Sequence, residues 1–114
     1  MSQHDLETVE LSIDHANKSI NLRNSLEKLT KNRDFKAVVL EGYFESEAVR
    51  LVLLKADPSM QDEESQKEIV KQIDAIGSFR QYLRTVMQLG DMASKAKDDY
   101  EQTREELLAE ELSE

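Results

Sequence analysis

Arg80 and Arg84 have the clearest capacity for binding chemistry in this sequence, because they lie four residues apart in a segment with helical periodicity. Side chains at that spacing share one face of a helix. The residues beside them are Phe79, Tyr82 and Leu83. Such a cationic and aromatic surface would hold a carboxylate or phosphate group of a partner. In the alternative, which we favour, both arginines pair with Glu45, Glu47 or a neighbouring subunit while their stems cover apolar surface.

Residues suited to catalysis or metal binding occur without the spacing that such sites need. The two histidines, His4 and His15, are eleven residues apart, and no His-x3-His or His-Glu-x-x-His pattern occurs. Acidic doublets occur at 98–99, 105–106 and 110–111, but adjacent residues on a helix point about 100° apart and do not converge on one ion. Cysteine, a phosphate-binding loop and a nucleophile turn are absent. We therefore expect no enzyme activity, no cofactor and no metal site.

Negative charge is concentrated at the C-terminal end of the chain. Of a formal net charge of −9, residues 98–114 contribute eight acids against the single base Arg104, while the other 97 residues carry 14 bases and 16 acids. Acidic segments of this kind serve as solvating or interaction tails. Nucleic-acid binding depends on clustered Lys and Arg, so it is not expected. The longest apolar run, residues 51–54, is far short of the roughly 20 residues that a membrane span needs.

The composition predicts a single all-α domain. Only three glycines and one proline interrupt the 114 residues, and a chain rich in Glu, Lys, Gln, Leu and Ala favours helices over short strands. We expect a helical hairpin or small helix bundle with a long C-terminal amphipathic helix. The expected organisation is a flexible arm at 1–11, a helical domain at 12–97 and an acidic tail, helical or disordered, at 98–114.

Residues 64–112 contain no proline and are predicted to form one long amphipathic helix. Its apolar positions recur in steps of four and three, with an arginine at position 80 of the stripe. These positions are Ile69, Ile73, Ile76, Leu83 and Met87. The helix would start at Asp62 or Ser65. Gly77 and Gly90 are expected to mark close helix approach or local bending, with a hinge at Gly90 as the alternative.

A shorter helix is predicted over residues 13–31. Ser12 would cap its start, because the hydroxyl can accept a hydrogen bond from a free amide of the first turn. Asn32 would end it in a left-handed conformation, and Asp34 would cap the next helix. The eleven residues before Ser12 show weak periodicity, so we assign them to the arm.

The second helical region begins at residue 35 and holds the densest aromatic and β-branched patch of the chain, residues 35–44. Glycine costs about 1 kcal/mol relative to alanine inside a helix, so Gly42 marks a kink or a close backbone contact, and we favour a kink. Ser46 would then cap a renewed segment over 47–55. This segment is apolar on nearly all sides, and since such helices are normally buried, we place the centre of the core there.

The long helix exceeds what a compact chain of this size can cover. A helix of about 49 residues spans about 70 Å at 1.5 Å per residue, whereas a compact domain of ~100 residues has a radius of gyration near 13 Å. Hydrophobic residues make up 39% of the chain, a thin supply for a self-contained core. We therefore expect a homo-oligomer or a partner along the helix. The candidate interaction residues are Phe35, Tyr43, Phe44, Ile69, Ile73, Ile76, Phe79, Arg80, Leu83, Arg84 and Met87.

Three stretches carry a likeness to a known class of protein. They are LEKLTKNRDFKAVVLEGYFESEAVRLVLLKADPSMQ at 26–61, IDAIGSFRQYLRTVMQLGDMA at 73–93 and the acidic TREELLAEEL at 103–112. Together they resemble small helical proteins of tailed bacteriophages, of the virion structural and assembly type. The resemblance implies particle assembly, self-association and binding to other phage virion proteins, in the host bacterial cytoplasm or incorporated in the virion. It includes no catalytic or ligand motif, so no functional residue is transferred from it.

The leading hypothesis is an oligomeric helical assembly protein in which residues 35–54 pack against residues 69–89 and copies join through the remaining apolar stripe. The alternative is an acidic phage-encoded inhibitor that imitates DNA and binds a basic host protein. Against it, the acids cluster in residues 98–114 and do not cover the whole surface. A DNA-packaging subunit would need a basic recognition helix, for which the arginines at 80 and 84 are a thin basis.

Overall fold

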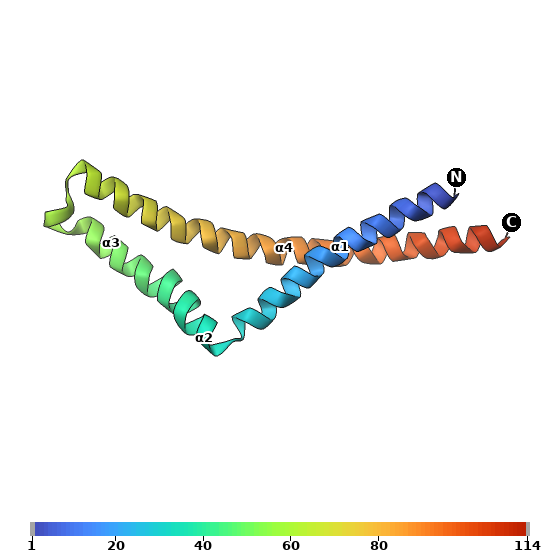
Figure 1. Cartoon of the computed structure of the whole chain (residues 1–114), viewed down its shortest axis with the longest axis horizontal. Coiled ribbons are helices and arrows are strands. Elements are labelled where there is room, and N and C mark those ends of the chain that lie inside the picture. The colour runs from blue at the N-terminus through green and yellow to red at the C-terminus, as the bar shows by residue number, and fades with distance from the viewer. Residues whose placement is uncertain (1, 114) are drawn as a thin grey trace. The chain divides into compact units, whose positions relative to one another are not determined.

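The computed structural model describes residues 2–113, and its regular elements are all helical (Figure 1). They are α1 (Ser2–Thr30), α2 (Arg33–Phe35), the π-helix η1 (Lys36–Glu47), α3 (Ala48–Ala56), the 3₁₀ turn η2 (Pro58–Met60) and α4 (Glu63–Ser113). The predicted all-α class with a long C-terminal helix is confirmed. The chain forms two compact units. Unit 1 holds the described residues up to Leu26 and from Val86 onward, and unit 2 is Glu27–Thr85.

Unit 2 contains an antiparallel helical hairpin. The continuous helical arm formed by α2, η1 and α3 leads to the turn at η2, and the first part of α4 returns beside it (Figure 1). Three buried side chains, Leu51, Ile69 and Ile76, form the core between the arms. The half-buried residues around them are Tyr43, Phe44, Ala48, Leu54, Met60 and Ile73. Segment 35–54 therefore packs on the beginning of the long helix, where the apolar stripe places the contact.

The π-helix η1 replaces the kink that the sequence suggests. In π winding the hydrogen bonds reach from residue i to i+5, which makes the helix wider. η1 passes into α3 without a break, and no side chain caps the start of α3. The prediction of a kink at Gly42 with a new start at Ser46 is therefore wrong. A Cβ atom at Gly42 would lie 2.9 Å from the carbonyl oxygen of Ala37, so close backbone contact accounts for this glycine.

Asn32 caps the hairpin's first arm. Its backbone is extended (φ −71°, ψ 127°), and its side chain accepts a hydrogen bond from the amide of Phe35 at 3.0 Å. The predicted left-handed conformation of Asn32 and the predicted cap at Asp34 are therefore both wrong. The extended backbone of Asn32 lets its side-chain oxygen reach the first turn of the next arm. The same residue therefore separates α1 from that arm.

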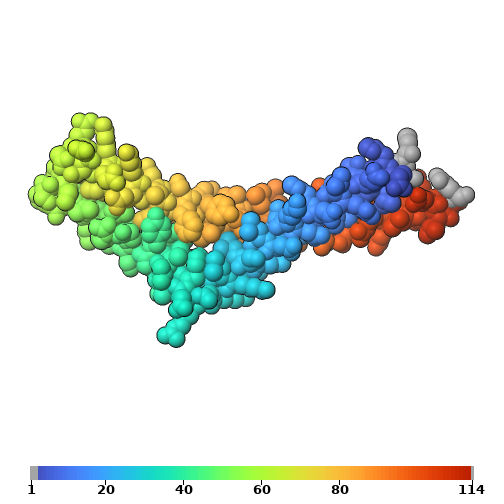
Figure 2. Space-filling view, in the orientation of Figure 1, coloured from blue at the N-terminus to red at the C-terminus, as the bar shows by residue number. Residues whose placement is uncertain are grey.

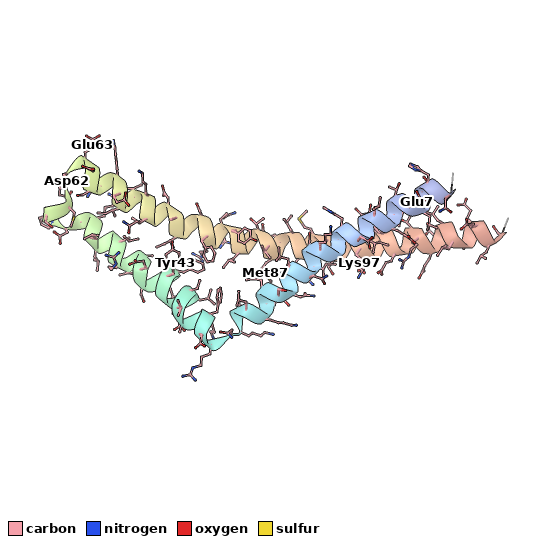
Figure 3. All side chains as sticks on the ribbon, in the orientation of Figure 1. Glu7, Tyr43, Asp62, Glu63, Met87 and Lys97 are labelled. Atoms are coloured by element: carbon pink, nitrogen blue, oxygen red, sulfur yellow. The ribbon has the colours of Figure 1, made fainter. Side chains whose placement is uncertain are left out.

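Two aspartates fix the turn between the hairpin arms. α3 ends at Ala56, before Asp57 and Pro58, as the proline predicts. Asp57 accepts from the amide of Ser59 at 2.8 Å, and Asp62 accepts from the amide of Ser65 at 2.9 Å. Hydrogen bonds from the serine hydroxyls and amides lower the pKa of both carboxyl groups. Of the two predicted starts for the long helix, Asp62 is the residue that caps it, and Figure 3 shows it beside Glu63 at the turn.

Unit 1 contains an antiparallel pair made by α1 and the last part of α4 (Figure 1). α1 begins at Ser2, so the segment assigned to an arm is helical wherever it is described, and Met1 lies outside the described residues. The predicted cap at Ser12 is wrong, because its hydroxyl lies inside α1 and donates to the carbonyl oxygen of Thr8 at 3.0 Å. Leu6 and Val9 are half-buried, and helices in proteins are stabilised mainly by such packing.

The seam of unit 1 follows a three-and-four spacing on both helices, as in a coiled coil. α1 contributes Leu6, Val9, Ile13, Ala16, Ile20 and Arg23, and α4 contributes Val86, Gly90, Ala93, Lys97, Tyr100, Arg104 and Leu107. The α4 side includes two basic residues and a glycine, so it does not form a continuous apolar stripe in the sequence. Lys97, labelled in Figure 3, keeps its charged end accessible while its stem is partly covered.

Gly90 allows the two helices of unit 1 to approach closely. A Cβ atom at this position would overlap the Cβ of Arg23 and lie 2.8 Å from its Cγ. The Arg23 guanidinium then donates to Asp91 at 3.0 Å. Close approach, as predicted, therefore explains Gly90. At Gly77 a Cβ would meet nothing within 4 Å, and nothing in the structure explains that glycine.

Candidate functional site

Several of the predicted interaction residues are used inside unit 2. Ile69 and Ile76 are buried against Leu51, and Ile73 packs on the same core. The middle of the predicted stripe is therefore packed inside the hairpin and is not free to bind a partner. Phe35 and Leu83 are half-buried in unit 2, and Met87 is half-buried in unit 1.

An aromatic cluster links the two arms of the hairpin. Tyr43 and Phe44 come from η1 and Phe79 from α4, with ring-centroid distances of 5.9 Å (43–44), 6.3 Å (43–79) and 5.5 Å (44–79). Figure 3 shows Tyr43 on the side of η1 that faces α4. Adjacent residues diverge by about 100° in an α-helix and by less in the wider π-helix. The π winding therefore lets both neighbours reach the same ring.

Arg80 and Arg84 are exposed on α4, and neither makes an ion pair with another described residue. Glu47 instead binds Arg50 on its own helix through both carboxylate oxygens. The hydrogen bond from Arg50 lowers the pKa of Glu47. The pairing of the two arginines within the chain, as the sequence suggested, is therefore not formed, and their guanidinium groups face solvent.

α3 presents an apolar face to solvent on the side away from the hairpin core. Leu51 is 1% exposed, whereas Val49, Val52 and Leu53 are 57%, 58% and 67% exposed. The prediction that this helix forms the centre of the core is right for Leu51 and wrong for the other three residues. A hairpin has only one opposing arm, so it covers one side of α3 and leaves the other side on the surface, which Figure 2 shows for the segment coloured green.

Unit 1 has an open hollow of about 930 Å³ along its helix pair. From α1 it is lined by Leu11, Ser12, Asp14, His15, Ala16, Lys18 and Ser19, and from α4 by Leu89, Ala93, Ala96 and Tyr100. Leu11 and Leu89 are 69% and 50% exposed. The sequence predicts no function for this surface, because it assigns residues 1–11 to an arm and gives no sign that α1 pairs with α4.

No family model, curated protein or solved structure matches this chain. The resemblance to phage proteins therefore stays a prediction. In the part of the chain that the structure describes, no helix is both long enough and apolar enough to cross a membrane. Among residues 2–113, no three His, Cys, Asp or Glu side chains gather where they could hold a metal ion. The exposed apolar surfaces, on α3 in unit 2 and on the outer side of α1 in unit 1, are therefore the candidate interaction sites.

Proposed function

We propose that this chain is a non-enzymatic helical assembly protein that binds further copies of itself. The observation that supports the proposal is the outer face of α3, defined as Val49, Val52 and Leu53, each more than half exposed. Burying an aliphatic side chain of this size stabilises a protein or complex by about 1.5–3 kcal/mol relative to full exposure. Contiguous apolar surface of this kind marks interaction sites.

A second copy of the chain suits the outer face of α3 because of its charge. The chain has a formal net charge of −9, yet the nine residues of α3 include no acid and two bases, Arg50 and Lys55. Two copies of an acidic chain repel each other least where the local charge is small, and Arg50 is already paired with Glu47.

The resemblance in sequence supplies the proposed setting, which is the particle of a tailed bacteriophage. There the protein would assemble in the host bacterial cytoplasm, bind other virion proteins and be incorporated in the virion. The last part of α4 is helical to Ser113, and its aspartates and glutamates are mostly exposed. This segment would keep the assemblies soluble or bind a basic surface of another virion protein.

An inhibitor that imitates DNA has less support. Such a protein needs carboxylates spread over a surface the length of its target, whereas here they are concentrated on one segment, and the hairpin presents aliphatic and basic side chains. An imitation of the phosphate backbone does not account for the outer face of α3. Deleting residues 98–114 would abolish function in the inhibitor and would leave self-association intact in the assembly protein.

Light scattering at micromolar concentration tests the proposal. The unmodified chain is expected to be larger than a monomer, and Val52→Ser combined with Leu53→Gln is expected to raise the concentration required for association about tenfold or more. Leu112→Gln is the matched control, since Leu112 is 89% exposed but lies outside α3. A chain that is monomeric at every concentration tested, or a double variant as large as the unmodified chain, would contradict the proposal.

A further inference from the structure

The outer side of α1 indicates a second contact between copies, separate from α3. We propose that the outer stripe of α1, defined as Leu11, His15, Lys18 and Leu22, packs against the same stripe of a second copy about a two-fold axis. The two α1 helices would run antiparallel and cross between residues 16 and 17. This inference rests on the proposed self-association, and it adds a specific surface, orientation and charge pattern.

All four residues of the outer stripe are exposed. Leu11 and Leu22 are 69% and 50% exposed on the side of α1 opposite the seam, although burial would stabilise side chains of this size. The spacing of four, three and four residues places the stripe along one side of α1. Leu11, His15 and Lys18 also line the open hollow of unit 1, so a further helix can approach this side without displacing the seam.

The outer stripe matches itself when reversed. Its steps of four, three and four read the same in both directions, so an antiparallel crossing midway brings Leu11 of one copy opposite Leu22 of the other, and does so twice. His15 likewise meets Lys18 of the second copy. A contact between identical surfaces about a two-fold axis requires this kind of self-match.

The charges beside the stripe also complement a second copy. Asp14 and Lys18 line the hollow, and neither forms a salt bridge within the described part of the chain. In the antiparallel crossing, Lys18 of each copy lies opposite His15 of the other, and the Asp14 next to that His15 comes within reach of the same Lys18. Two symmetry-related ion pairs result. The other titratable groups lining the hollow are His15 and Tyr100, and α4 contributes no charged side chain there.

The α1 contact and the α3 contact together would let an assembly grow beyond two copies. Each joins two copies symmetrically, and a chain with two different symmetric contacts can bind one neighbour through each of them. Such a chain extends beyond a dimer into an open or closed series of copies. The α1 contact therefore gives each copy of the proposed assembly protein a second surface for binding another copy.

Charge reversal in two separate chains tests the α1 contact. The background is the full chain with Val52→Ser and Leu53→Gln, in which the α1 contact alone is expected to hold a dimer. Asp14→Lys makes both positions of the ion pair basic, and Lys18→Asp makes both acidic, so each variant repels itself. Each is expected to dimerise about tenfold more weakly than the background, because two ion pairs are lost at once. An equal mixture of the two variants restores both pairs and is expected to form a mixed dimer with the affinity of the background.

The matched control is Glu27→Lys, which reverses an exposed acid of α1 outside the stripe and is expected to leave dimerisation unchanged. Single variants that dimerise like the background, or a mixture that stays monomeric, would overturn the inference. A background that is monomeric while the unmodified chain is oligomeric would overturn the α1 contact and leave the proposed function standing. An unmodified chain that is monomeric would overturn both.

Discussion

Both units pack two antiparallel helical segments together, but they use different side chains at the contact. In unit 2 the hairpin arms meet through Leu51, Ile69 and Ile76, large aliphatic residues supported by an aromatic cluster. In unit 1 aliphatic residues such as Ile13 and Val86 are buried too, but the seam also includes the glycine Gly90 and the half-buried Lys97. Large side chains fill the space between two helices at their ordinary separation, whereas a glycine allows the two backbones to come closer. Unit 2 is therefore expected to be sensitive to loss of side-chain volume at Leu51, and unit 1 to added volume at Gly90.

The largest expected effect is the loss of volume in unit 2. Leu51→Ala removes the most buried side chain of the described residues and is expected to lower the free energy of unfolding by about 2–5 kcal/mol. Leu53→Ala, two residues away on the exposed side of α3, is expected to change it by less than about 0.5 kcal/mol in dilute solution. Urea denaturation followed by circular dichroism measures both. Equal losses for the two variants would show that α3 is not oriented as described.

Adding volume to unit 1 should have the next largest effect. In Gly90→Ala the new Cβ overlaps the Cβ of Arg23, so the helices must separate, and overpacking of this kind costs about 1–3 kcal/mol. The variant is expected to unfold at lower urea concentration despite the better helix propensity of alanine. An unchanged or raised midpoint would mean that α1 and α4 do not approach closely at this point.

Replacing the other glycine of α4, Gly77, by alanine provides a direct comparison with Gly90→Ala. A Cβ at Gly77 meets nothing within 4 Å, so Gly77→Ala is expected to stabilise the chain by about 0.5–1 kcal/mol through helix propensity alone. The two variants should therefore shift the urea midpoint in opposite directions. A destabilised Gly77→Ala would reveal a contact at that face, such as one with another copy.

The smallest effect concerns the turn of unit 2 and its dependence on pH. The pKa of Asp62 lies below the ordinary value of 3.8 because Ser65 donates hydrogen bonds to its carboxylate. A carboxyl group whose pKa is lowered by folding adds stability that is present above the pKa of the unfolded chain and is lost as the pH falls through the folded-state value. Asp62→Asn is therefore expected to be less stable than the unmodified chain near pH 7, and the difference between their melting temperatures should shrink on acidification below about pH 4. A difference that persists or widens at low pH would contradict this assignment.

The parts of the fold that the sequence could predict are those with a continuous apolar period or a proline. Ile69, Ile73 and Ile76 repeat at helical spacing, and they do form the face that packs in unit 2. Pro58 ends α3 at the predicted place. These signals are local, so one chain segment contains all the information needed.

The parts that could not be predicted depend on pairing between distant segments. Leu6 and Val9 show little periodicity on their own, and they are helical because the last part of α4 lies beside them. The outer face of α3 was predicted to be buried because the residue types alone do not show how many helices surround it. Positions that look correct for a core but remain exposed, such as Leu53 and Leu11, are the ones that indicate interaction surfaces.

The proposed assembly requires a second copy of the chain to cover the apolar helix faces that one copy leaves exposed. Distances between spin labels test it most directly, because the chain has no cysteine and accepts single labels at Gln3, Glu10 and Asn24. In the background that lacks the α3 contact, the antiparallel crossing predicts that the distance between the two labels of a dimer grows by about 3 Å for each residue from the crossing point between residues 16 and 17, in either direction. Gln3 should thus give the longest distance, and Glu10 and Asn24 similar shorter ones. Equal distances at all three positions, or no dipolar coupling at any of them, would contradict the account.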